Sequence, residues 1–100
     1  MKFMIILQEN FIDKLKEITK LSKKINHNDT HKILDIIKKH VEEIEELYNN
    51  KNDHWAIETA DLIILCYELL LMENKDIEDV FSRCLPRFDV KLEGLLINGS

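Results

Sequence analysis

The sequence predicts an all-α protein, and two observations support this fold class. Only two glycines and one proline occur in 100 residues, which leaves little of the turn chemistry that β-hairpins need. Apolar residues recur at intervals of three and four rather than two, as on one face of a helix. A chain of this length forms a single domain, residues 1–100, and buries only a modest core by itself. We therefore expect a four-helix bundle that is completed by oligomerisation.

The first two helices are expected at residues 8–25 and 30–49. The first places its apolar side chains on one face: Phe11, Leu15, Ile18, Leu21 and Ile25. The preceding apolar residues 3–7 either extend this helix or lie in an extended conformation. Residues 26–30 are polar and rich in capping side chains, so they separate the two helices. The second helix is expected to bury a stripe formed by Ile33, Ile37, Val41, Ile44 and Tyr48.

The third helix is expected at residues 54–73, with Asp53 as its N-terminal cap. Its residues are apolar on nearly every side, which is typical of a helix that is buried on nearly every side. Cys66 and Met72 are assigned to the core. Because four helices of one chain cannot cover such a helix completely, the pattern indicates a subunit interface.

The fourth helix is expected to begin after Asp76, which can cap it, with Asp79 in the position of a capping-box acid. Pro86 is expected to kink or end this helix, because its ring removes a hydrogen-bond donor and clashes with the preceding turn. Residues 87–92 then restart as a short helix that stops at Gly94.

Charge and composition exclude several classes of function. The net charge of −5 and the pI near 5.3 argue against binding to nucleic acid or to anionic membranes, since phosphate groups attract basic proteins. The apolar residues 1–7 are too few to span a bilayer and carry no signal cleavage site. Cys66 and Cys84 form no CxxC pair, so neither a disulfide framework nor a zinc site is predicted from them. We expect a soluble, cytoplasmic protein.

Carboxylates gather on the second and third predicted helices, as EEIEE at residues 42–46 and ETAD at residues 58–61. Glu58 and Asp61 lie one turn apart on the apolar third helix, where a buried carboxylate needs a compensating cation such as Mg²⁺. A run of Glu behind two lysines is usually a solvated helix surface, but the second acidic pair favours a site of four carboxylates. A di-iron bundle would need Glu-x-x-His pairs, and the sequence contains none.

Over roughly residues 30–92, the chain resembles the MazG-type family of all-α nucleoside triphosphate pyrophosphohydrolases. The resemblance lies in the order of its motifs: EExxE, a short connection, ExxD and a last helix with basic residues. The resemblance implies a MazG-like bundle in a homodimer or homotetramer, with Arg87 and Lys91 on triphosphate oxygens. It also implies that four carboxylates hold Mg²⁺, with Mn²⁺ as a substitute: Glu43, Glu46, Glu58 and Asp61. Either Glu42 or Glu46 is a candidate for the base that accepts a proton from the attacking water.

Three positions depart from the pattern of this family. His54 stands where the family often has a lysine before ExxD, and it is kept as a candidate substrate-binding residue. Leu85 replaces a frequent asparagine in the last helix, and Pro86 also departs from the pattern. These departures favour the alternative that the chain is a non-catalytic relative.

Three further residues allow two interpretations each. Trp55 could stack on a base of the substrate or fill a subunit interface. Lys39 could contact a phosphate or form an ion pair with Glu43 one turn later. Glu68 could join a network behind the metal or pair with a basic residue of a neighbouring subunit. His40, like His27 and His31, is interpreted most simply as a polar surface group.

The predicted reaction is attack of water on the α-phosphorus of a (deoxy)nucleoside triphosphate, which releases the monophosphate and pyrophosphate. Metal ions would assist this attack. Such an enzyme would remove unwanted nucleotides from the deoxynucleotide pool. Two alternatives remain at this point: a non-catalytic helical interaction module or lapsed MazG relative, and a phosphoribosyl-ATP pyrophosphatase, which shares the acidic pattern.

Overall fold

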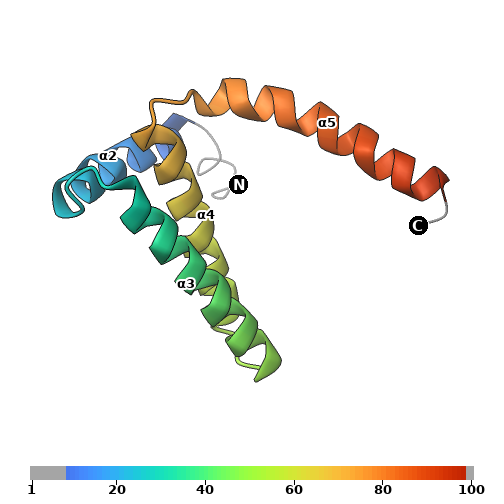
Figure 1. Cartoon of the computed structure of the whole chain (residues 1–100), viewed down its shortest axis with the longest axis horizontal. Helices are drawn as coiled ribbons and strands as arrows, with labels where there is room; N and C mark the ends of the chain where they lie inside the picture. The colour runs from blue at the N-terminus through green and yellow to red at the C-terminus, as the bar shows by residue number, and fades with distance from the viewer. Residues whose placement is uncertain (1–8, 99–100) are drawn as a thin grey trace.

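The computed structural model describes residues 9–98, which form four helices and no strand: α2 (Glu9–Ile25), α3 (Thr30–Asn49), α4 (Trp55–Met72) and α5 (Ile77–Ile97). Figure 1 shows α3 and α4 as an antiparallel pair, with α2 beside one end of the pair and α5 extending away from it. The all-α prediction is confirmed. The expectations for residues 1–8, including the start of the first helix, lie outside the described residues. None of the four helices is long and apolar enough to cross a bilayer.

The polar segment between α2 and α3 caps α3, as expected. Asp29 is the N-cap, and its side chain accepts hydrogen bonds from the backbone N–H groups of His31 (3.0 Å) and Lys32 (3.4 Å). Two residues in the left-handed region, His27 (φ 53°) and Asn28 (φ 59°), reverse the chain direction before it. Local hydrogen bonding of this kind places the start of α3 where the sequence predicts it, and the observed end at Asn49 also agrees with the prediction.

The start of α4 differs from the prediction. The N-cap is His54, which makes no capping hydrogen bond through its side chain, so the assignment of Asp53 as the cap was wrong. Instead the side-chain oxygen of Asn52 accepts a hydrogen bond from the His54 N–H at 3.0 Å. The Asp53 carbonyl accepts one from the Ala56 N–H at 3.2 Å, which closes the first turn of backbone. A turn centred on Asn52 therefore begins the helix.

Asp76 caps α5 as predicted, since its side chain accepts a hydrogen bond from the backbone N–H of Asp79 at 3.2 Å. The carboxylate of Asp79 forms an ion pair with Arg83, 3.3 Å away, one turn further along the helix. Both charged groups are exposed, so this pair contributes little to stability.

The predicted end of α5 at Pro86 and the predicted stop at Gly94 were both wrong, because one helix continues through Pro86 to Ile97. Proline removes the N–H that would bond to the carbonyl of Ser82, four residues earlier. Ser82 is exposed, so water can satisfy that carbonyl and the cost of the missing bond falls. Gly94 lies within this helix, and its carbonyl accepts a hydrogen bond from the N–H of Asn98 at 3.0 Å.

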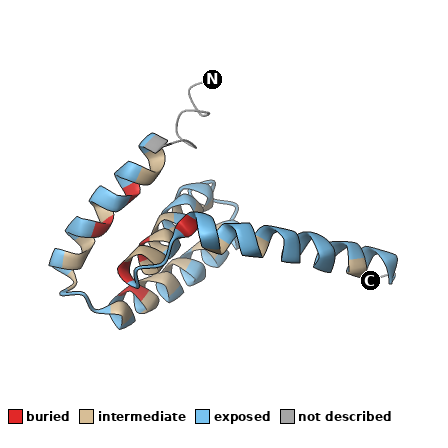
Figure 2. Cartoon of the chain, turned by 90° about the horizontal axis from the view of Figure 1, so that it is seen from above, coloured by how far each residue is buried: buried red, intermediate tan, exposed pale blue. Residues whose placement is uncertain are grey.

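The core of the described chain is small and lies where α2, α3 and the start of α5 meet α4 (Figure 2). Its fully or nearly buried apolar residues are Leu15, Ile33, Met72 and Ile77. Tyr67 of α4 links three helices, with edge or tilted ring contacts to Phe11 (6.1 Å between centroids) and Phe81 (5.8 Å). The assignment of Met72 to the core is confirmed.

Several core assignments fail within the single chain. Val41 and Tyr48 are 51% and 63% exposed, so the predicted stripe of α3 is only partly correct. The exposed Cys66 is not a core residue. Ile57 and Ile63 on α4 are at least half exposed, so α4 is not buried on nearly every side by its own chain.

Exposure of apolar residues is most extensive on α5. Figure 2 shows this helix almost wholly in the colour of exposed residues. Eight of its large hydrophobic residues are exposed: Phe81, Leu85, Phe88, Val90, Leu92, Leu95, Leu96 and Ile97. Apolar surface on this scale is typical of an interaction face.

Candidate metal centre

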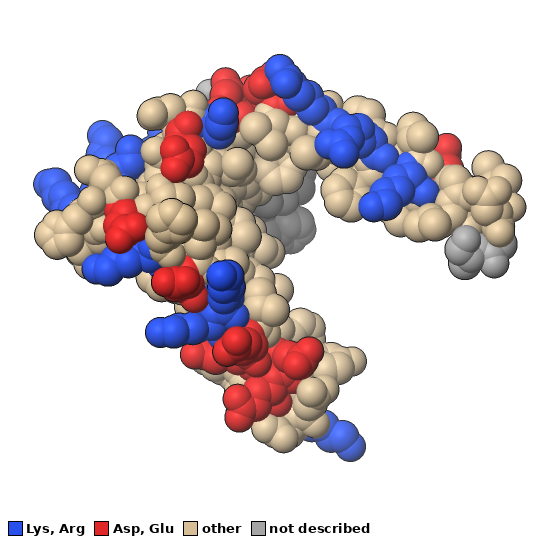
Figure 3. Space-filling view, in the orientation of Figure 1, with Lys and Arg blue, Asp and Glu red and all other residues tan. Residues whose placement is uncertain are grey.

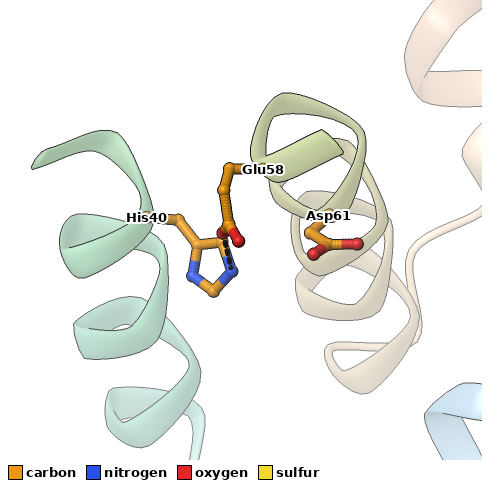
Figure 4. A group of neighbouring side chains, drawn as sticks. All are labelled: His40, Glu58 and Asp61. Atoms are coloured by element: carbon orange, nitrogen blue, oxygen red, sulfur yellow. Dashed lines mark ion pairs between the residues drawn. The ribbon is translucent and has the colours of Figure 1, made fainter. Parts of the chain in front are cut away.

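Glu58 is the centre of the polar contacts between α3 and α4. It lies in the first turn of α4, and its side chain is only 17% exposed. One carboxylate oxygen lies 3.3 Å from Nε2 of His40, and the other lies 3.3 Å from Nε2 of His54. Figure 4 shows the His40 ring reaching across from α3 toward Glu58. A carboxylate in the least polar helix is thus placed between two imidazoles.

Asp61 completes a group of three potential metal ligands. One ligand atom each from His40, Glu58 and Asp61 lie within 4.8 Å of one another. His40 and Glu58 are half-buried, whereas Asp61 is exposed. The group is therefore held between α3 and α4 (Figure 4) and reaches solvent through the exposed Asp61. A cation there could keep positions for water or substrate.

His40 is the residue that the sequence interpretation missed, because it was assigned to the surface. Its Nδ1 lies 3.1 Å from the carbonyl oxygen of Ile36, one turn earlier on α3. His40 shares a helical spacing of three and four with the other inner positions of α3, so this spacing could have placed it on the inner face. These positions, 33, 36, 40, 44 and 47, are all buried or half-buried.

The four carboxylates implied by the family resemblance are not all brought together. Glu58 and Asp61 lie in the three-residue group, whereas Glu43 and Glu46 are exposed on α3 and outside it. Glu42 is also exposed. Figure 3 shows acidic side chains gathered over the last turns of α3. These residues form an acidic surface on the helix that carries His40.

The candidate substrate residues near the end of the α3–α4 pair are exposed or packed within the chain. Trp55 is half-buried and contacts the Tyr48 ring edge-on, with 5.6 Å between ring centroids. His54 contacts Glu58, as described above, and remains 55% exposed. Lys39 is exposed, and within residues 9–98 no ion pair joins it to Glu43.

Arg87 and Lys91 are exposed on α5, which Figure 1 shows extending away from the α3–α4 pair. They line a shallow hollow of about 540 Å³ together with Pro86, Phe88 and Val90. In Figure 3 the basic side chains of α5 lie well apart from the acidic surface of α3. A single chain therefore does not bring the predicted phosphate contacts to the predicted metal ligands.

Glu68 has a role that the sequence interpretation did not include. It is 5% exposed and accepts a hydrogen bond from the hydroxyl of Ser22 on α2 at 3.3 Å. Burial raises the pKa of this carboxyl, and the Ser22 hydrogen bond lowers it by less. Glu68 therefore belongs to the contact between α2 and α4 rather than to a network behind Asp61.

The arrangement can hold a divalent cation between two helices and leave part of its coordination open. Glu58 and Asp61 supply the oxygen donors that hard cations prefer, and His40 supplies nitrogen. Comparison with known proteins found no matching family model, no similar curated protein and no similar solved structure.

Proposed function

We propose that this protein is a metal-dependent pyrophosphohydrolase of nucleoside triphosphates, related to the MazG-type enzymes. The observation that supports it most directly is the position of Glu58 and Asp61, whose carboxylates lie with His40 in one group that is open to solvent. A triphosphate is a polyanion, so a site for it on an acidic helix pair requires a cation. The residues of the group fit this requirement.

Glu58 and Asp61 would hold the ion, and Glu43 and Glu46 would extend the acidic surface beside it. When bound, Mg²⁺ or Mn²⁺ would neutralise phosphate charge and lower the pKa of the attacking water. Glu42 or Glu46, both solvent-accessible, would accept the proton from that water. The products would be a nucleoside monophosphate and pyrophosphate, and removal of unwanted deoxynucleotides is the role that fits such a reaction.

The proposal includes association into a homodimer or homotetramer. The exposed apolar residues of α5 support it, since their burial against a second copy would be favourable. Arg87 and Lys91 lie on the same helix. Association through α5 would give these cations a route to the acidic surface of another copy, where they would contact the phosphates.

A second candidate is a helical interaction module without catalysis. Two contacts favour it: His40 and His54 both face Glu58, so protonated imidazoles could compensate its charge without a metal ion. In that case the exposed face of α5 would bind a partner protein.

The test is pyrophosphate release from a panel of ribo- and deoxynucleoside triphosphates, measured with Mg²⁺ and with excess EDTA. We expect pyrophosphate release to require metal. We also expect the rate of release to fall at least about a hundredfold in Asp61→Ala, because losing a metal ligand should reduce activity at least as much as losing a residue that supports a ligand. The matched control is Asp13→Ala, which removes an exposed carboxylate from α2 and should release pyrophosphate at the wild-type rate.

Failure to release pyrophosphate from any triphosphate would reject the enzyme and favour the interaction module. Equal activity in the Asp61 and Asp13 variants would reject the metal assignment. Both variants change exposed residues, so neither should disturb folding.

A further inference from the structure

The imidazole of His40 is held in one orientation by its own helix. Nδ1 lies 3.1 Å from the Ile36 carbonyl oxygen, which can only accept a hydrogen bond. Nδ1 therefore carries the hydrogen, and Nε2 is directed toward α4 (Figure 4). Histidines that bind metal ions are typically fixed in this way, by a bond from the second ring nitrogen to a carbonyl or carboxylate oxygen.

Nε2 of His40 then faces an oxygen of Glu58 at 3.3 Å. A neutral ring with its hydrogen on Nδ1 offers Nε2 only as an acceptor, and the carboxylate oxygen also accepts. Two acceptors at this separation need a positive group, either a second proton on the ring or a metal ion. Metal–ligand bonds of roughly 2.1 Å place two ligands of a tetrahedral ion about 3.4 Å apart. The observed separation fits two ligands of one ion.

Asp61 supplies the third donor, within 4.8 Å of the other two. The set thus holds one imidazole nitrogen and two carboxylates, drawn from α3 and α4. Imidazole favours zinc and its neighbours in the transition series, whereas Mg²⁺ is bound through oxygen. His54, on the other oxygen of Glu58, would act as a positioning residue that holds this carboxylate toward His40.

We propose that His40, Glu58 and Asp61 form a site for a divalent transition metal ion of the zinc class, bound through Nε2 of His40. This inference rests on the proposed function for the assignment of Glu58 and Asp61 as ligands. It adds a nitrogen ligand, which makes the site prefer Zn²⁺ or Co²⁺ to Mg²⁺.

The test is metal titration of the untagged full-length chain, with Co²⁺ followed by its visible absorption and Mg²⁺ by calorimetry. The variants are His40→Gln and the matched control His31→Gln, an exposed histidine near the start of the same helix. We expect His40→Gln to weaken Co²⁺ binding at least about tenfold and to leave Mg²⁺ binding unchanged. His31→Gln should bind both ions like the wild type, and Zn²⁺ should displace the Co²⁺.

Equal Co²⁺ affinity in His40→Gln and the wild type would overturn the proposal, as would loss of Co²⁺ binding in Cys66→Ser, which lacks the exposed thiol. Asp61→Asn provides a second ligand variant at an exposed position, so a defect in folding cannot explain a shared loss. If the protein releases pyrophosphate but its Co²⁺ binding does not depend on His40, only the transition-metal site is rejected and the proposed enzyme stands. Co²⁺ binding that depends on His40, with no release from any triphosphate, would reject only the proposed enzyme.

Discussion

Replacing Ser22 with alanine tests the contact that joins α2 to α4. Glu68 is 5% exposed, and the Ser22 hydroxyl donates to its carboxylate at 3.3 Å. Asn26 in turn donates to the Ser22 oxygen at 3.1 Å. Within residues 9–98 no basic side chain forms an ion pair with Glu68. Ser22→Ala would therefore leave a buried carboxylate without its donor.

We expect this change to lower the free energy of unfolding by about 1–3 kcal/mol at neutral pH, the usual cost of a buried polar group that loses its partner. For a domain of this size, each kcal/mol lowers the melting temperature by about 4–8 °C. The loss should depend on pH, because the protonated carboxyl of Glu68 is easier to bury than the ionised one.

The sign of this pH dependence follows from the raised pKa of Glu68. Burial places the folded pKa above the ordinary value of 4.5, so the folded chain holds this proton more tightly than the unfolded chain. The stabilisation from that proton is fully present below about 4.5 and is lost as the pH rises through the folded pKa. Removal of Ser22 removes the contact that lowers the pKa, so the loss of stability should be larger at neutral pH than near 4.5.

The assay is urea unfolding followed by far-UV circular dichroism at several pH values and one fixed protein concentration, since association would add to the apparent stability. Ser82→Ala is the control, because that exposed hydroxyl donates only to the Asp79 carbonyl, and we expect a change within about 0.5 kcal/mol. In a Glu68→Gln background, the loss of stability caused by Ser22→Ala should no longer depend on pH. Equal losses for the Ser22 and Ser82 variants, or a Ser22 loss that does not vary with pH, would refute this account of Glu68.

Two further predictions concern the core and the face of α5. Leu15 is 2% exposed, so Leu15→Ala should lower the free energy of unfolding in urea by about 2–5 kcal/mol. Leu21 is 61% exposed, so Leu21→Ala should lower it by less than about 0.5 kcal/mol. Similar losses for the two variants would contradict the packing of α2. Phe88→Glu should lower the molar mass measured by light scattering without loss of helix content, because it places a charge in the proposed contact between copies. An unchanged molar mass would remove α5 from the association surface.

The sequence predicted the helices well where their ends are decided locally. Asp29 and Asp76 cap α3 and α5 through hydrogen bonds that span only two or three residues, so the residue type and position are sufficient. The expectation that Pro86 could end the helix was wrong, because its effect depends on what surrounds the carbonyl that it leaves without a donor. That surrounding is solvent only because α5 is exposed, which the sequence alone does not show.

The candidate site was predicted only in part for a similar reason. Glu58 and Asp61 are three residues apart on one helix, so helical periodicity alone places them together. The contact of Glu58 with His40 depends on how α3 and α4 are aligned, which the turn at residues 50–54 sets. The stripe predicted for α3 also passed over His40 because polar residues were left out of it. If polar residues are also counted at the positions three and four residues apart that line the inner face of α3, His40 falls on that face.

The arrangement of charge has a consequence for any reaction of a triphosphate. The proposed acidic and imidazole ligands lie on α3 and α4, and Arg87 and Lys91 lie on α5, which extends away from that pair (Figures 1 and 3). A metal ion and a phosphate-binding cation can act on one substrate only if these parts meet. The apolar residues around Arg87 and Lys91 are the ones whose burial would favour such a meeting, at about 25 cal/mol for each Å² removed from water. If the proposed enzyme is correct, association through α5 and assembly of the site are therefore a single event, and catalysis should be lost when the chains separate.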